Sequence, residues 1–193
     1  IKIAPDGEIL IKGDNVMKGY YKNPSATKDV MTRDGYFMTG DIGIIDEDGF
    51  LVITDRKKDI IVTANGKNVA PQSIESRIGQ DYYVEQVVII GDRQKYITAL
   101  IVPSFDALME YARSKGISFS SKEELVNNPS IIEFYKERIE TQSKGIAHFE
   151  QIQKFTLLPD PFSIEKGEIT PTMKIKRKVI AANFKDEIKK MYS

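Results

Sequence analysis

The chain contains no cysteine and no tryptophan, and it has a single histidine, His148, among 193 residues. The lack of cysteine excludes disulfides, thiolate metal sites and cysteine nucleophiles. One histidine leaves almost no room for a His-ligated metal centre, so we expect His148 to be a surface or helix-end residue. No apolar run approaches the roughly 20 residues that span a bilayer, and no signal-peptide pattern opens the chain. We therefore expect a soluble, cytoplasmic chain, with peripheral membrane contact of a longer parent left open.

The chain has no excess of positive or negative charge, because 28 basic side chains balance 28 acidic ones to a formal net charge of zero. No global field therefore attracts nucleic acid or anionic lipid, and we expect no nucleic-acid partner. An initiator methionine is absent too, since the chain opens with Ile1 in an alternating apolar and polar stretch. We expect a fragment of a longer protein.

Up to about residue 55 the sequence indicates short strands and turns. Residues 7–13 form one apolar stretch between glycines. Residues 42–45 are expected to pair with residues 50–53 across the turn at 46–49, where a glycine can take a positive φ. From about residue 60 the sequence indicates mixed helices and strands, and a basic cluster at residues 56–58 lies at this transition. We place a domain boundary there, with residues 1–57 and 58–193 in different domains.

The second part alternates strand and helix patterns, which predicts an α+β fold with a central antiparallel sheet and flanking helices. A short two-stranded piece is expected near Ile60. The two strong strands are residues 87–90 and 96–102, separated by a polar turn. Proline, serine and asparagine at helix starts, and apolar residues every three or four positions, predict helices that begin at Pro71, Ser104, Ser121, Pro129 and Lys176.

Three polar clusters stand where packing does not require them, and the first is Thr39-Gly40-Asp41. A carboxylate offers two acceptor oxygens and no donor, so Asp41 on a glycine-adjacent turn is suited to hold a vicinal diol such as a ribose. The alternative is an ordinary turn or capping aspartate.

The second cluster joins Arg56, Lys57 and Lys58 to the segment at residues 64–68, which contains Gly66. The guanidinium of Arg56 presents a fixed fork of donors to phosphate or ribose oxygens, and a glycine lets a narrow ligand pass close to the backbone. The alternative is a solvated charge run at a domain junction.

The third cluster is the basic segment at residues 169–178, which leads into the last helix. Its functional reading is that Lys174 delivers an ammonium to a phosphate, where it neutralises charge that develops during transfer chemistry. The alternatives are a solvated helix face, or a weak nucleic-acid or membrane patch around Lys176, Arg177 and Lys178.

The order of these clusters resembles the carboxy-terminal part of the AMP-forming acyl-CoA synthetases of the adenylate-forming superfamily. The resemblance covers nearly the whole chain and is closest to long-chain fatty acid–CoA ligases. The segments that carry it are Gly7-Glu8-Ile9, Val16-Met17-Lys18-Gly19-Tyr20-Tyr21-Lys22-Asn23-Pro24, Gly35-Tyr36-Phe37-Met38-Thr39-Gly40-Asp41, Asp55-Arg56-Lys57-Lys58-Asp59-Ile60-Ile61, Asn65-Gly66-Lys67-Asn68-Val69-Ala70-Pro71 and Pro171-Thr172-Met173-Lys174-Ile175-Lys176-Arg177.

The resemblance implies a role for each candidate residue. Asp41 would bind the ribose hydroxyls of ATP and of an acyl-adenylate, and Arg56 would contact ribose or phosphate. Lys58 would be the hinge about which a small domain turns against a large one. Lys174 would be the catalytic lysine of adenylation, and Gly66 would border the pantetheine tunnel.

The implied reaction converts a long-chain fatty acid, ATP and CoA into acyl-CoA, AMP and pyrophosphate through an acyl-adenylate. Residues 1–57 would end the large AMP-binding domain, and residues 58–193 would be the mobile small domain. The family's phosphate loop, its fatty-acid tunnel and most of its Mg²⁺ and ATP contacts would lie upstream. We therefore expect the chain alone to be inactive, and a dimer of it could be an artefact of truncation.

Two other functions stay open at this stage. One is an acyl–acyl-carrier-protein synthetase, or another adenylation enzyme that serves a carrier protein, in which the acceptor is a tethered thiol. The other is a non-catalytic binding module that uses the basic stretch from Lys174 to Lys178 on nucleic acid or anionic membrane. Strong salt-dependent binding to DNA or anionic vesicles would favour the second of these.

Overall fold

The computed structural model describes all 193 residues and divides into two compact units, Ile1–Ile60 and Ile61–Ser193. Each unit contains its own sheet. None of the helices in either unit is long and apolar enough to cross a membrane.

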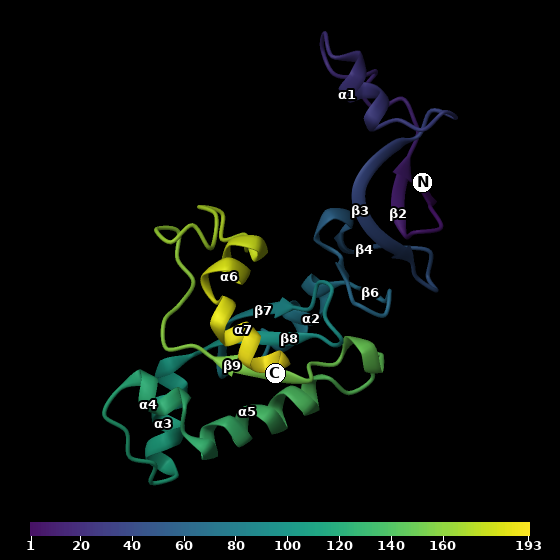
Figure 1. Cartoon of the computed structure of the whole chain (residues 1–193). Coiled ribbons are helices and arrows are strands. Elements are labelled where there is room, and N and C mark those ends of the chain that lie inside the picture. The colour runs from purple at the N-terminus through teal and green to yellow at the C-terminus, as the bar shows by residue number, and fades with distance from the viewer. The chain divides into compact units, whose positions relative to one another are not determined.

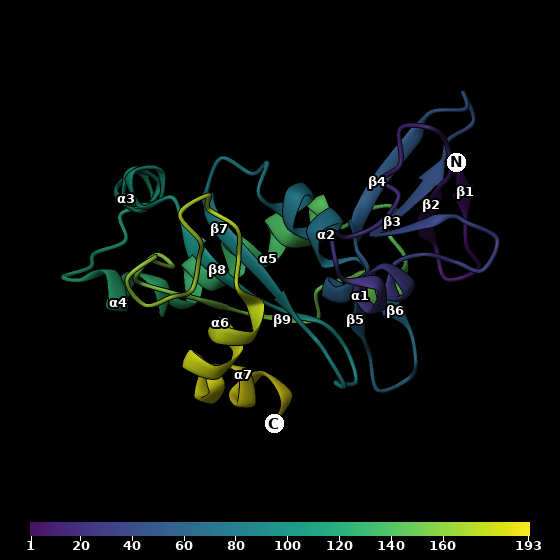
Figure 2. The ribbon, with the colours of Figure 1, turned by 90° about the horizontal axis from the view of Figure 1, so that it is seen from above.

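The first unit is built on a four-stranded antiparallel sheet in the order β1-β2-β3-β4 (Figure 2). The predicted hairpin is confirmed: Ile44 lies opposite Val52, and the turn at residues 46–49 contains Gly49 at φ +85°. One short helix interrupts the strands, and Asn23 caps it by accepting a hydrogen bond from the Ala26 amide. The elements are β1 (Lys2–Ile3), β2 (Glu8–Ile11), α1 (Pro24–Asp29), β3 (Phe37–Ile45), β4 (Leu51–Arg56) and the 3-10 helix η1 (Lys57–Asp59).

The first unit has little apolar interior of its own. Its fully buried hydrophobic side chains are Ile9 and Leu10, both on β2. The β3–β4 hairpin instead exposes large apolar side chains, at Ile44, Ile45, Phe50, Val52 and Ile53. The side chains of neighbouring strand residues point to opposite faces, so this hairpin leaves apolar side chains exposed on both of its faces.

The second unit contains a two-stranded piece and a three-stranded sheet in the order β7-β8-β9 (Figure 1). The antiparallel pairing of β7 with β8 is as predicted, and every residue of β8 is buried, so both faces of the sheet are covered. The third strand was not predicted, and it runs parallel to β8 because a helical connection separates the two in the chain. The strands are β5 (Ile61–Val62), β6 (Asn68–Val69), β7 (Val84–Ile90), β8 (Thr98–Pro103) and β9 (Lys154–Leu157).

Helices of the second unit begin where the capping residues predict. Ser121 accepts a hydrogen bond from the Glu124 amide, and Asn128 accepts one from the Ser130 amide. The periodic residues of the longest helix are all buried, at Ile131, Tyr135 and Ile139. The helices are α2 (Pro71–Ile78), α3 (Phe105–Ser114), α4 (Lys122–Val126), α5 (Pro129–Gln142), the 3-10 helix η2 (His148–Glu150), α6 (Arg177–Asn183) and α7 (Lys185–Tyr192).

The prediction of one continuous final helix is wrong at Phe184. This residue has φ −106° and ψ +32°, outside helical geometry, and it separates α6 from α7. Its ring packs edge-to-face on Phe162, with the ring centroids 5.7 Å apart. The predicted apolar face is nevertheless correct, since Ile180 is buried and Ile188 packs against the core.

A buried ion pair ties α6 to α2 and β7. The guanidinium of Arg177 pairs with the Glu75 carboxylate and donates to the Ile89 carbonyl at 2.8 Å, while the Ile89 amide donates to Glu75 at 2.8 Å. The Arg177 side chain is 20 % exposed and that of Glu75 is 9 % exposed. Arg177 is therefore a core contact and not part of the solvated helix start that the basic sequence around it suggested.

Substitution of Arg177 by methionine should destabilise the second unit by about 3 kcal/mol, since it removes the guanidinium that pairs with the buried Glu75 carboxylate and donates to the Ile89 carbonyl. Urea unfolding of the 193-residue chain, followed by helical circular dichroism, measures this loss, because nearly all helix lies in that unit. Lys178→Met, on an exposed neighbour in the same helix, is the matched control. Equal unfolding midpoints for the two variants would show that the ion pair does not hold the unit together.

Candidate functional site

Asp41 and Arg56 face each other across two strands. They are register partners on β3 and β4, and the Arg56 Nε lies 3.4 Å from an Asp41 carboxylate oxygen. The side chains are 31 % and 50 % exposed respectively. Asp41 was expected on a turn, and this is wrong, because the strand runs through it. Strand pairing instead brings the two predicted ligand residues together at an accessible place.

The surface around this pair is hollowed. A depression of about 370 Å³ is lined by Thr39, Gly40, Asp41, Arg56, Lys57 and Lys58. The first predicted cluster therefore meets the basic part of the second, residues 56–58, within the first unit, whereas Gly66 of the second cluster lies in the other unit. The hollow is open, carries both carboxylate and cationic groups, and is of the size of small-molecule sites.

Thr39 fixes the backbone on the Asp41 side of the hollow. Its hydroxyl donates to the Ile9 carbonyl at 2.8 Å and accepts from the Asp41 amide at 3.1 Å. Gly40, between them, has φ +72°, a left-handed conformation that favours glycine. The Asp41 carboxylate therefore projects from a backbone held by hydrogen bonds on both sides.

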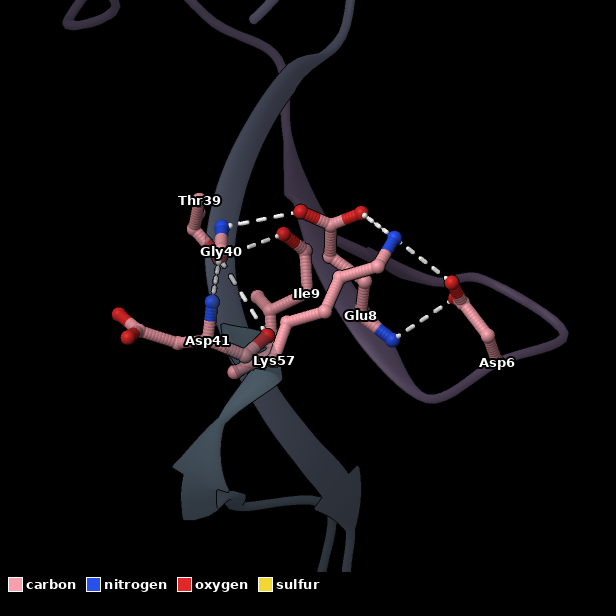
Figure 3. A network of polar contacts seen from close by, with 7 residues as sticks. All are labelled: Asp6, Glu8, Ile9, Thr39, Gly40, Asp41 and Lys57. Carbon is pink, nitrogen blue, oxygen red and sulfur yellow. Dashed lines mark hydrogen bonds and ion pairs between the residues drawn. The ribbon is translucent and has the colours of Figure 1, made fainter. Parts of the chain in front are cut away.

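Two residues that line the hollow, Gly40 and Lys57, belong to a polar network that the sequence did not predict (Figure 3). The carboxylate of Glu8 is 5 % exposed, accepts from the Gly40 amide at 2.9 Å and pairs with the Lys57 ammonium at 2.8 Å. Lys57 also pairs with Asp6 at 2.7 Å, and Asp6 accepts from the Glu8 amide at 3.2 Å. The only sequence signal was the position of Glu8 between Gly7 and an apolar run.

These contacts fix the charges in the network. Hydrogen bonds to Asp6 and Glu8 raise the pKa of Lys57 above its usual value. The Lys57 ammonium, with the Glu8 amide, lowers the pKa of Asp6 below its usual value. Lys57 is therefore a cation and Asp6 an anion at neutral pH, and both hold the Glu8 segment in place.

Lys58 lies in η1, the last element of the first unit, and its side chain is exposed. The unit boundary falls two residues later, between Ile60 and Ile61. The proposed hinge position therefore stands next to the division of the chain into units.

Gly66 lies in the turn between β5 and β6, in the second unit. It has φ +72°, and its amide donates to the Thr63 carbonyl at 2.9 Å. A side chain added there would meet nothing within 4 Å, so open space adjoins this backbone. The turn requires glycine for its conformation, and a ligand could approach it closely.

Lys174 lies at the end of a tight loop, and both its amide and its carbonyl are hydrogen-bonded to Thr170. The Lys174 amide donates to the Thr170 hydroxyl at 2.9 Å, and the Thr170 amide donates to the Lys174 carbonyl at 2.9 Å. Ile169 and Ile175 pair across the base of the loop. The Lys174 side chain is exposed, and no ion pair or hydrogen bond within the chain occupies its ammonium.

Met173, directly before this lysine, has φ +60°. The left-handed region costs a non-glycine residue roughly 1 kcal/mol. Met173 therefore occupies a conformation that favours glycine, directly before the candidate lysine.

A buried carboxylate also holds the base of the Lys174 loop. Glu168 is 1 % exposed and accepts from the Ser163 amide and from the Asn183 side chain, both at 3.0 Å. The Lys176 amide donates to the Glu168 carbonyl at 2.8 Å. The loop is therefore fixed at its entry by Glu168 and at its exit by Arg177.

The predicted site residues thus fall into two groups. Asp41, Arg56 and Lys58 surround one hollow in the first unit, whereas Gly66 and Lys174 lie on separate loops of the second. His148 is an exposed residue of η2, as expected. No group of three or more histidine, aspartate or glutamate side chains is arranged to hold a metal ion.

Comparison with known proteins shows long-chain-fatty-acid–CoA ligases among the relatives. The chain is 42 % identical over 194 aligned positions to long-chain-fatty-acid–CoA ligase FadD15 of Mycobacterium tuberculosis, which covers all of this chain and 32 % of that protein. It is 40 % identical over 190 positions to mouse long-chain-fatty-acid–CoA ligase 5, covering 97 % of this chain and 28 % of the relative. The chain thus spans about a third of the length of these relatives.

Among solved structures, the adenylation domain of carboxylic acid reductase from Segniliparus rugosus, in complex with AMP and a co-purified carboxylic acid, is similar. It superposes with a TM-score of 0.75 at 25 % identity, covering 96 % of this chain and 28 % of that one. The α+β fold expected from the sequence is therefore confirmed. The model of the family described as AMP-binding enzyme C-terminal domain matches residues 58–193. The chain belongs to the AMP-binding enzyme C-terminal domain family.

Proposed function

We propose that this chain is the C-terminal part of an AMP-forming long-chain fatty acid–CoA ligase. The observation that carries the proposal is the 42 % identity to a long-chain-fatty-acid–CoA ligase, which extends over both units. Two features of the site support the same function. The Asp41–Arg56 pair is suited to bind a nucleotide, and the unpaired ammonium of Lys174 is suited to neutralise negative charge on phosphate oxygens.

In this proposal, residues 1–57 end the large AMP-binding domain and residues 58–193 form the mobile small domain. The scant apolar interior of the first unit supports the assignment, since such a unit would gain stability from further neighbours. The match of the family to residues 58–193 supports the start of the small domain at Lys58.

Asp41 and Arg56 bind the nucleotide in the proposed enzyme. The two carboxylate oxygens of Asp41 accept from the two ribose hydroxyls, which requires the guanidinium of Arg56 to share or release its 3.4 Å contact. Arg56 then donates to ribose or phosphate oxygens with its planar fork. The acyl-adenylate is held by the same contacts, since it contains the same ribose.

Lys174 acts in the first half-reaction. A fatty carboxylate oxygen attacks the α-phosphorus of ATP, the bond to pyrophosphate breaks, and pyrophosphate leaves. The Lys174 ammonium neutralises negative charge on the carboxylate and phosphate oxygens as the new bond forms. The exposed loop allows this delivery because no partner in the chain has to be given up.

In the second half-reaction the CoA thiolate attacks the acyl carbon and AMP leaves. We assign the exchange between the two half-reactions to rotation of the small domain about Lys58, which withdraws Lys174 and presents the Gly66 turn to the pantetheine arm. The open space beside Gly66 is compatible with a thin ligand that runs close to the backbone. The Mg²⁺ that accompanies ATP and the fatty-acid tunnel are assigned to the part of the ligase outside this chain.

The function is tested on the full-length enzyme that contains this chain. AMP release is followed for carboxylic acids from acetate to palmitate, with and without CoA. Turnover that requires CoA and is greatest with long acids is the expected result. AMP release that proceeds only with an acyl-carrier protein would replace CoA by a tethered thiol as acceptor. Absence of acid-dependent AMP release in every case would contradict the proposal.

Lys174→Ala in the full-length enzyme should lower the rate of adenylation by about 10² to 10³-fold, the cost of removing one preorganised charge stabiliser. Thioester formation from a supplied acyl-adenylate should change far less, because Lys174 is withdrawn in that step. Single-turnover rates of the two half-reactions measure the difference. Lys166→Ala removes another exposed lysine from the connection between β9 and α6 that contains Lys174, and serves as the control. Equal losses in both half-reactions would refute the role of Lys174.

The 193-residue chain by itself should release no AMP from ATP and fatty acid above the buffer background. The reason is that the phosphate contacts and the acid-binding tunnel are assigned to the missing two thirds of the enzyme. The measurement is a coupled AMP assay with palmitate, with the full-length enzyme as positive control. Acid-dependent AMP release by the chain alone would show that the residues needed for adenylation are all present in it.

A further inference from the structure

The Glu8 carboxylate occupies an unusual position for a charged group. It is 5 % exposed and lies on β2, beside the two buried apolar residues of the first unit. Removal of an ionised carboxylate from water costs several kcal/mol unless donors replace the lost hydration. The replacement comes from the Gly40 amide on one oxygen and from the Lys57 ammonium on the other.

The two donors stand next to the two candidate nucleotide ligands in the sequence. Gly40 directly precedes Asp41, and Lys57 directly follows Arg56. The Glu8 carboxylate therefore links Lys57 to Gly40 in the middle of β3 (Figure 3). Arg56 is the last residue of β4, directly before Lys57. Asp6 adds a second anchor to the Lys57 ammonium at 2.7 Å.

We propose that Glu8 and Lys57 are positioning residues for the nucleotide site: together they set the separation and direction of Asp41 and Arg56. The Lys57 side chain lines the hollow, but its ammonium is engaged by Glu8 and Asp6. The inference rests on the proposed function, since it assigns ligand binding to Asp41 and Arg56. Glu8 acts on Asp41 through the Gly40 peptide, and Lys57 acts on Arg56 through the adjoining backbone.

A purely structural role would not require this pair. Buried ion pairs add little net stability compared with apolar side chains of similar volume, because desolvation offsets the attraction. They do impose direction, since a carboxylate accepts only along its lone pairs and an ammonium must meet it there. The charged pair thus constrains geometry at a position where geometry decides ligand affinity.

The test uses the full-length enzyme with Glu8→Gln, Lys57→Met and Lys57→Arg. Glutamine at position 8 keeps an acceptor for the Gly40 amide but removes the negative charge that pairs with Lys57. Because the Lys57 side chain is about half exposed, its substitution carries little risk to folding. Binding of a fluorescent AMP analogue and the steady-state dependence on ATP are measured. Glu47→Gln makes the same charge change on an exposed turn of the same unit and is the matched control.

Glu8→Gln and Lys57→Met are each expected to weaken AMP binding and raise the KM for ATP by about 10-fold, a typical cost of losing an orienting partner behind a ligand-binding group. Saturating kcat should stay within about 2-fold. Lys57→Arg should recover most of the affinity, and Glu47→Gln should behave as wild type. The double variant Glu8→Gln/Lys57→Met should bind AMP with about the same affinity as the single variant that binds AMP more weakly, because both substitutions remove the same contact.

Loss of kcat at unchanged KM would overturn the proposal, since that is the signature of a smaller folded fraction. Unchanged AMP affinity in Lys57→Met would overturn it as well, whether or not Glu8→Gln folds. Asp41→Ala separates this inference from the proposed function. If Asp41→Ala weakens AMP binding and the Glu8 and Lys57 variants do not, only the positioning role fails. If Asp41→Ala leaves AMP binding unchanged, the nucleotide site itself is wrongly assigned.

Discussion

A carboxylate that is taken out of water must be given hydrogen-bond donors, and three glutamates of this chain satisfy that requirement in the same way. Glu8, Glu75 and Glu168 each accept from one backbone amide and from one side-chain donor: Gly40 with Lys57, Ile89 with Arg177, and Ser163 with Asn183. Glu8 and Glu75 join segments that are distant in sequence, and Glu168 connects the two ends of the segment that contains the Lys174 loop. The positions of the candidate functional groups depend on these three anchors.

The anchors are buried while the functional groups stay exposed, and this division has a physical reason. Asp41, Arg56 and Lys174 need access to a ligand, so apolar packing cannot hold them. The backbone that carries them must therefore be held by contacts on its buried side. Hydrogen bonds to a buried carboxylate are directional enough to do this. The Lys174 loop shows the result most simply, because Thr170 and Glu168 fix its backbone while the ammonium remains without a partner.

Much of the fold could be predicted from local patterns, and the failures have identifiable causes. The β3–β4 hairpin, the caps at Ser121 and Asn128 and the buried face of α5 follow from short-range rules, and all are confirmed. The third sheet strand, β9, is four residues long, and it forms by pairing with β8 residues 56 positions earlier in the sequence. The buried contacts of Glu8 and Arg177 could not be predicted for the same reason, because their partners Gly40 and Glu75 are 32 and 102 positions away in the sequence.

Met173 shows how the anchored backbone changes what a sequence position tolerates. A non-glycine residue at φ +60° costs roughly 1 kcal/mol in the folded chain, but it also restricts the unfolded chain more than glycine would. The hydrogen bonds of Thr170 to the amide and the carbonyl of Lys174 close the loop in this conformation. The direction in which Lys174 leaves the loop is therefore set by the closure at Thr170 and by Glu168, and not by the flexibility of position 173.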